Sequence, residues 1–324
     1  MKTDRIILCL ALLNFISKCA AYDWKKWQEE LELSYPEQFT FDLELEKDSI
    51  IEGEPIIVSC HIVNHSSKIA RIIFPPLNRK EALHYYTINF YVKEDTIAYI
   101  YAPYVHADIG IEPAQEKLLL PGDTMFLNGI LYPDNFWSYK ERKRVALLPN
   151  IYKLWARIHL GVKFYPRPAR DLRIVSDSVK FSIKASSIKE KQELNTISPY
   201  LREFFGYCEE TDIPDSSRNA AYPKLDKIRK TDSYLAPYAE FVYIGLLAFD
   251  KDREKLDKGI IEAQRFLKKH TSSILGEEME FLLAKMFYRK AGISDEFKKQ
   301  ARHLLEKYPK NINCFEIKKL LEEK

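Results

Sequence analysis

The hydrophobic pattern of this chain changes its period at about residue 190. Before that point, apolar and polar residues alternate in short runs, as in Phe39, Phe41 and Leu43. After it, apolar residues recur every three or four positions, as in the run 241–249. Strand side chains alternate between two faces, whereas positions three and four apart share one face of a helix. The sequence therefore predicts an α+β multidomain protein, with an N-terminal antiparallel β-sandwich and a C-terminal all-α domain of helical hairpins.

The start of the chain has the pattern of an export signal. Lys2 and Arg5 precede an apolar run over 6–16, and small residues lead to a cleavage position after Ala21. The run is shorter than the roughly 20 residues that span a bilayer. We therefore expect an exported protein, periplasmic or extracellular, with no membrane span in the mature chain. A retained N-terminal membrane anchor is the alternative.

The remaining length fits two domains of about 100–200 residues each. We expect a signal peptide over 1–21, an amphipathic helix over 22–37, the sandwich over 38–187 and the helical domain over 188–324, with a polar linker at 186–193. The net charge of +3 is small for 324 residues. This charge argues neither for nucleic-acid binding nor for an acidic tail. We expect the partner to be another protein and not a nucleic acid.

Nine short strands are predicted in the first domain from alternating apolar residues between turn residues. They cover 39–45, 56–63, 69–74, 86–92, 97–101, 117–120, 125–131, 152–159 and 178–185. In the strand over 152–159 the even positions are expected to face the core. Trp155 is then on the outer face, where another element, such as the helix over 24–33, is expected to cover it. Two stretches, 132–145 and 163–174, are predicted as long polar loops.

Seven helices are predicted in the second domain. They cover 197–207, 222–229, 236–250, 253–269, 277–291, 295–308 and 314–323. Residues 266–271 match 304–309 at an offset of 38, which indicates a repeat of one helical hairpin. We expect Gly245 to allow close approach of the second helix of its hairpin near Ala263, as Ala284 does near Ala301.

The segment 282–309 resembles a tetratricopeptide-type repeat. Ala284 stands at the small position of the first helix, and Phe287 and Tyr288 stand at its aromatic positions. Phe297 departs from the family pattern, which prefers Ala there, and the period exceeds 34 residues. The resemblance implies a helical solenoid that binds partners through its concave face. A generic pair of helical hairpins is the alternative.

The first domain is similar to the immunoglobulin-like sandwich modules of exported bacterial proteins. Four segments in the same order carry the resemblance: 51–55, 120–123, 149–154 and 175–179. The middle two also resemble the proteinase-inhibitor module of the BsuPI type, although Asn150 stands where a Gly is usual. The resemblance implies a fold and no activity, because one fold hosts many functions.

No catalytic motif is present in the sequence. The seven histidines show no zinc-site spacing, no Gly-x-Ser-x-Gly occurs, and the ten glycines form no phosphate-binding cluster. His106 and Asp108 are compatible with two ligands on one side of a strand, but a metal needs more. We expect no catalytic residue, no cofactor and no metal. Whether the protein is an enzyme stays open, with a non-enzymatic protein favoured.

Three cysteines remain outside the export signal, Cys60, Cys208 and Cys314. An odd number does not permit a complete set of disulfides within one chain. Cys60 is expected to pack in the core as a small apolar residue. Cys208 and Cys314 are both in the helical domain, and a disulfide between them is left open.

The stretch 132–145 interleaves basic and aromatic residues, which are enriched at binding surfaces. The candidate partner-binding residues are Phe136, Trp137, Tyr139, Lys140, Arg142, Lys143 and Arg144. A solvated loop whose aromatic side chains pack on the sandwich is the alternative. The sequence favours an exported, non-enzymatic protein for protein–protein interaction or scaffolding at the cell envelope. An envelope enzyme or a protease inhibitor acting through the sandwich loops is the second possibility.

Overall fold

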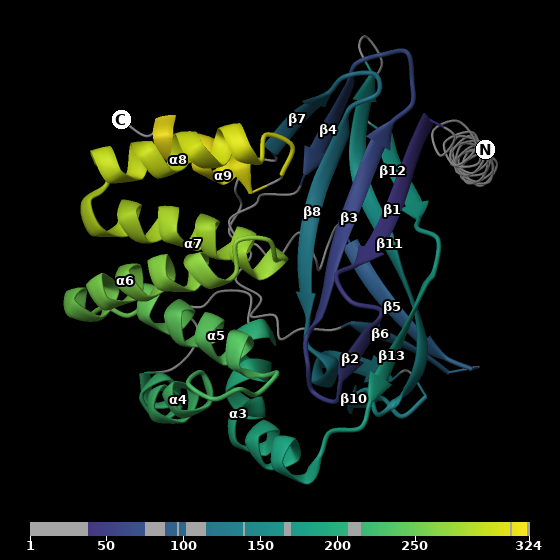
Figure 1. Cartoon of the computed structure of the whole chain (residues 1–324). Coiled ribbons are helices and arrows are strands. Elements are labelled where there is room, and N and C mark those ends of the chain that lie inside the picture. Colours follow the sequence, from purple (N-terminus) through teal and green to yellow (C-terminus); the bar gives the residue numbers. More distant parts are fainter. Residues whose placement is uncertain are drawn as a thin grey trace, which may run out of the picture.

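The computed structural model describes residues 38–74, 88–95, 97–101, 115–138, 140–164, 170–206, 215–311 and 313–322. Within these ranges a β region of antiparallel sheets precedes a helical region that begins at Ile188 (Figure 1). This is the α+β order that the change of period predicts. The predicted export signal, the predicted helix over 22–37, His106, Asp108 and Cys208 lie outside the described residues.

The smaller sheet has three antiparallel strands. They are β1 (Phe39–Leu45), β3 (Ile56–Asn64) and β8 (Thr124–Leu131), with β3 in the middle. Cys60 lies opposite Leu43 of β1 and Leu127 of β8, and all three side chains are buried. Burial raises the pKa of the Cys60 thiol, which packs as the expected apolar residue.

The larger sheet has ten strands in the described ranges. Its main path runs β10 (Lys143–Val145), β9 (Phe136–Ser138), β6 (Ile97–Tyr101), β5 (Ile88–Glu94), β11 (Asn150–Phe164), β13 (Val179–Lys184) and β2 (Ser49–Ile51). Beside this path, β12 (Arg170–Val175) and β4 (Ala70–Phe74) pair with β11, and β7 (Gln115–Leu119) pairs with β4. Only the β13–β2 pair is parallel among these pairings.

One hydrophobic core is shared by the two sheets. Phe41 and Val58 from the smaller sheet belong to the same buried cluster as Phe90 and Leu154 from the larger one. On β11 the even residues from Tyr152 to Ile158 are buried, as the sequence predicts. Trp155 is therefore on the outer face.

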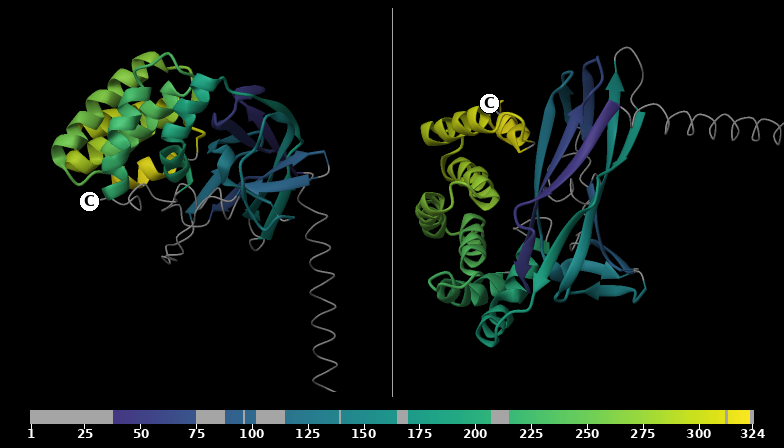
Figure 2. Two further views of the ribbon diagram at one scale, coloured as in Figure 1. Left: turned by 90° about the horizontal axis from the view of Figure 1, so that it is seen from below. Right: turned by 45° about the vertical axis from the view of Figure 1, so that its right-hand side comes forward.

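The helical region consists of seven α-helices in the described ranges. They are α3 (Ile188–Gly206), α4 (Asp215–Ile228), α5 (Ala236–Ala248), α6 (Arg253–Lys269), α7 (Ile274–Ala291), α8 (Asp295–Lys307) and α9 (Cys314–Glu322). Asp252, Ser273 and Ser294 cap α6, α7 and α8 by accepting hydrogen bonds from backbone N–H groups of the first turn. The helices stack beside the smaller sheet, with α3 and α9 at opposite ends of the array (Figures 1 and 2).

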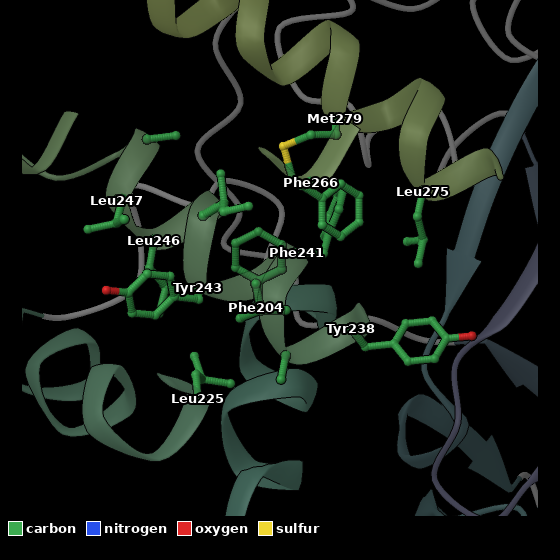
Figure 3. Close-up of a cluster of buried hydrophobic side chains, with 14 of the residues drawn as sticks. Phe204, Leu225, Tyr238, Phe241, Tyr243, Leu246, Leu247, Phe266, Leu275 and Met279 are labelled. Carbon is green, nitrogen blue, oxygen red and sulfur yellow. The ribbon is translucent and has the colours of Figure 1, made fainter. Parts of the chain in front are cut away.

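Aromatic side chains fill the core of the helical array. The rings of Phe204, Phe241 and Phe266 meet edge to face, with centroids 6.3 Å and 6.1 Å apart (Figure 3). A Cβ added at Gly245 would lie 2.3 Å from Cζ of Phe204. The sequence predicts that Gly245 faces α6 near Ala263, and this is wrong. The nearest side chain to Gly245 belongs to α3, which packs on this face of α5. Ala284 and Ala301 do share one buried cluster.

The helical and β regions share buried contacts. Ile57 and Tyr132 of the β region belong to the hydrophobic cluster of the helices. The Tyr101 hydroxyl donates to the Phe205 carbonyl at 3.1 Å. At the β2–β3 turn, the hydroxyl of Tyr234 donates to the carbonyl of Glu52 at 2.7 Å.

The turn between α8 and α9 contacts the free edge of β8. The backbone N–H of Phe126 donates to the Lys310 carbonyl at 3.0 Å, and Phe126 forms a parallel bridge with Asn311. The Asn311 amide also donates to Oε1 of Glu277. Burial, and then the neighbouring Glu278, raises the pKa of Glu277 to about 7.

Three expectations from the sequence need correction or stay open. The polar stretch 186–193 is helical from Ile188, so it is no linker. In the stretch predicted as a loop over 163–174, residues 170–174 belong to β12. Cys314 is buried, with Sγ 3.0 Å from the Tyr308 carbonyl; its proposed partner Cys208 is not described.

None of the helices in the described ranges is both long and apolar enough to cross a membrane.

Candidate binding face

The stretch predicted as a partner-binding loop forms a β-hairpin at the edge of the larger sheet. Strand β9 follows a short 3-10 helix, η3 (Pro133–Asn135), and pairs with β10. The loop prediction is therefore wrong for these residues. The strands have three residues each, which is too short to show an alternating pattern in the sequence.

The hairpin separates the predicted residues into three environments. Phe136 is fully buried against Tyr101, with ring centroids 5.3 Å apart, so it is a core residue. Lys140, Arg142 and Lys143 are exposed at the turn. Arg142 has φ 51°, the left-handed conformation of tight turns, and Lys143 pairs with Glu141 at 2.9 Å.

Trp137 and Arg144 lie on the outer face of the sheet and are partly exposed. They are opposite each other in the β9–β10 pairing. Tyr139 lies outside the described residues. The structure thus keeps two of the seven predicted residues together on one open face.

Cross-strand pairing extends this pair into a row across five strands. Trp137 is opposite Ile100, Ile100 is opposite Tyr91, and Tyr91 is opposite Trp155. Directly opposed residues share a face of the sheet. We name Arg144, Trp137, Ile100, Tyr91 and Trp155 the aromatic row. All five side chains are partly exposed.

The rings at one end of the row stack on each other. The Tyr91 and Trp155 centroids are 5.5 Å apart, and their planes differ by 12°. The Arg157 guanidinium carbon lies 5.6 Å from the Tyr91 centroid. Tyr91 therefore covers part of Trp155, the residue for which the sequence predicts a cover.

A second row lies two residues away along the strands. Lys93 of β5 is opposite Lys153 of β11, which is opposite Lys180 of β13. All three are exposed, and none forms an ion pair with another residue in the described ranges. We name these residues the lysine row. Together the two rows form a face of aromatic and basic side chains.

The inward side of β6 supports this face. Tyr99 packs against the shared core, and burial followed by the charge of Glu94 raises the pKa of its hydroxyl. The phenol therefore stays neutral at physiological pH. Strands β5 and β6 lie on the side of the β region away from α5–α8 (Figures 1 and 2).

Sequence reasoning did not assign Tyr91, Ile100 or Trp155 to a site. The signal in the sequence is the odd position of Trp155 in its strand. This aromatic side chain points outward, while the residues immediately before and after it in the sequence point inward. Within the described ranges, no three His, Cys, Asp or Glu side chains gather as a metal ion would require.

Comparisons with known proteins give distant similarities. No protein-family model matches the chain, and no curated protein matches it. A β-glucosidase from Listeria innocua is 14% identical with a TM-score of 0.22, over 45% of this chain and 16% of the glucosidase. Spo0M, a sporulation control protein from Bacillus subtilis, is 14% identical with a TM-score of 0.23, over 50% of this chain and 55% of Spo0M. The chain thus spans a minor part of the first and about half of the second, and scores this low carry no argument about function.

Proposed function

We propose that this chain is an exported, non-enzymatic protein of the cell envelope that binds another protein through the outer face of its larger sheet. The aromatic row is the single observation that carries the proposal. It places two Trp, one Tyr and one Arg on one face. These three residue types dominate the binding energy of protein interfaces.

The dimensions of the row suit an interface. Five strands at about 4.8 Å spacing give a row about 19 Å long. The flanking basic residues supply a polar rim around an apolar centre, which is the usual anatomy of an interface. The hairpin that carries Trp137 and Arg144 is anchored by Phe136 in the core, so the two side chains are held in place before binding.

The finer fold assignments are part of the same proposal. An immunoglobulin-like sandwich is supported by the core that the two sheets share. A tetratricopeptide-like repeat is supported by the matching ends of α6 and α8. His270 and Tyr308 both have φ −124°, and their N–H groups bond to the carbonyls of Phe266 and Leu304, 38 residues apart.

Export is supported by the basic and apolar pattern of residues 1–21. Expression of the full chain with a C-terminal tag in a bacterial host tests it. N-terminal sequencing of the protein from the periplasm or medium is expected to begin at Tyr22. Recovery of the whole pool in the cytoplasm with Met1 intact would contradict export.

Site-specific crosslinking tests the binding face. A benzophenone amino acid replaces Trp137, and a control protein carries it at Ile261, which is 52% exposed on α6. Illumination in an envelope extract of the source organism is expected to give one discrete protein adduct from position 137 and none from position 261. Excess unlabelled wild-type protein suppresses the adduct, whereas excess Tyr91→Ala/Trp155→Ala protein does not. Equal adducts at both positions would refute the proposal.

A further inference from the structure

We infer that the partner presents an acidic amphipathic helix, with its carboxylates on the lysine row and its apolar side chains on the aromatic row. This inference rests on the proposed function and specifies the chemistry of the partner. The argument uses the charge, the ring geometry and the spacing of the two rows.

The lysine row places like charges directly opposite each other on three paired strands. Like charges directly opposite each other destabilise a sheet. No described acidic residue forms an ion pair with Lys93, Lys153 or Lys180. A bound anionic group would offset this repulsion.

Protection of a sheet edge does not explain these lysines. Lysine is common on edge strands, where it prevents pairing with another chain. Strand β5 pairs with β6 and β11, and β11 pairs with β5 and β13, so Lys93 and Lys153 are on interior strands. Their positive charge faces solvent at the middle of the sheet.

The ring geometry at Tyr91 argues against a stacked nucleobase as the ligand. Flat ligands stack on a free aromatic face. One face of Tyr91 is covered by Trp155 and the Arg157 guanidinium lies 5.6 Å from its centroid. In the row, the shorter side chain of Ile100 lies between Tyr91 and Trp137. Ala98, two residues before Ile100 on β6, lies on the same face. Apolar side chains of a partner can pack there.

The spacing of the rows matches a helix lying across the strands. Positions within a row are about 4.8 Å apart, and the rows are about 7 Å apart along the strands. Side chains three or four apart on a helix are separated by about 5–6 Å. Same-side residues of an extended chain are about 7 Å apart, which fits the repeat within a row less well.

A binding titration tests the inference with a defined probe. The probe is a fluorescein-labelled 20-residue peptide with a Glu stripe beside a Leu stripe at helical spacing, followed by fluorescence anisotropy. A scrambled peptide of the same composition is the matched probe. The charge-reversed protein is Lys93→Glu/Lys153→Glu. The control protein is Lys251→Glu/Lys268→Glu, which makes the same change of net charge at two exposed residues, one in the turn between α5 and α6 and one on α6.

We expect the full chain to bind the patterned peptide at least about 10-fold more tightly than the scrambled one, with weaker binding at higher salt. Lys93→Glu/Lys153→Glu is expected to lose at least about 10-fold in affinity, and the control less than about 2-fold. Trp137→Phe removes part of the apolar surface of the aromatic row and is expected to weaken binding of the patterned peptide.

Equal affinity for both peptides, or for both charge variants, would overturn the inference. Binding to vesicles of phosphatidylglycerol and phosphatidylcholine or to heparin, with no binding to the patterned peptide, would overturn it in favour of those ligands. If the position-137 adduct forms while the peptide does not bind, the proposed function stands and the partner class is wrong. If neither occurs, both fail.

Discussion

The hydroxyl of Tyr238 on α5 lies 2.9 Å from Oε1 of Glu54, at the turn between β2 and β3. The Glu54 carboxylate is buried and also accepts from Nζ of Lys47 at 2.6 Å and from the backbone N–H of Ile51 at 3.0 Å. One carboxylate thus links the helical region to the β region. Because the two regions share buried contacts, we expect them to unfold together.

Tyr238→Phe is expected to lower the free energy of unfolding by about 1–3 kcal/mol, because a buried charged acceptor loses a donor. Urea denaturation followed by far-UV circular dichroism measures the change, with one transition for both regions. Tyr200→Phe is the control, since its hydroxyl accepts from Lys224 at an exposed position. For this control variant, the free energy of unfolding is expected to fall by less than about 0.5 kcal/mol. Equal losses in the two variants would contradict the role of Tyr238.

Glu277 makes stability depend on pH. Its pKa of about 7 in the folded chain exceeds the ordinary value of 4.5, so folding favours the protonated form. This contribution is complete below about pH 4.5 and is lost as the pH rises to about 7. As the pH rises from 4.5 to 8, wild type is expected to lose up to about 3 kcal/mol of unfolding free energy, and Glu277→Gln is expected to keep it. Thermal melts across this range measure it, and exposed Glu306→Gln is expected to follow wild type.

Gly245→Ala is expected to destabilise the protein, although Ala is the better helix former. The new Cβ would meet the Phe204 ring, and overpacking of this kind costs about 1–3 kcal/mol. Phe204→Leu removes the far end of that ring. The double variant Gly245→Ala/Phe204→Leu is therefore expected to lose less than the sum of the single losses. Strict additivity in urea melts would show that the two positions are not in contact.

Arg229 contacts side chains of three helices, α4, α5 and α6. Its guanidinium lies 2.7 Å from Asp226, 3.1 Å from Glu262 and over the Tyr243 ring at 4.4 Å. Arg229→Leu is expected to cost less than the roughly 3–5 kcal/mol of an unpaired buried charge, because Asp226 keeps Lys230 and Glu262 keeps Arg265 as partners. Replacing Glu262 by Leu as well is expected to recover part of the loss. No recovery in the double variant would place the cost in lost packing and not in charge.

Much of the local structure follows from the sequence. Alternation over residues 152–158 predicts both the buried face of β11 and the outward position of Trp155. The start of α3 also has a sequence signal that the polar composition of 186–193 obscured. The side chains of Ser187 and Glu190 bond to each other's backbone N–H groups at 3.3 Å and 2.7 Å. This is a capping box, and these bonds lower the pKa of Glu190.

Contacts between distant segments could not be predicted in the same way. The aromatic row depends on the register of four strand pairs, and a register is set by long-range packing. Trp137 and Arg144 were identified from their residue types, but their alignment with Tyr91 was not. The neighbour of Gly245 was also mispredicted, because periodicity identifies the buried face of a helix and not the element that packs on it.

The bridge between Phe126 and Asn311 has a consequence for how the chain is made. At a synthesis rate of about 5–20 residues per second, the 184 residues between Phe126 and Asn311 take about 10–40 seconds to emerge. During that interval the edge of β8 has no partner at Phe126, and an open strand edge favours pairing with other chains. The α8–α9 turn thus completes the smaller sheet last. Newly made chains that stop before residue 310 would be the ones most prone to aggregate.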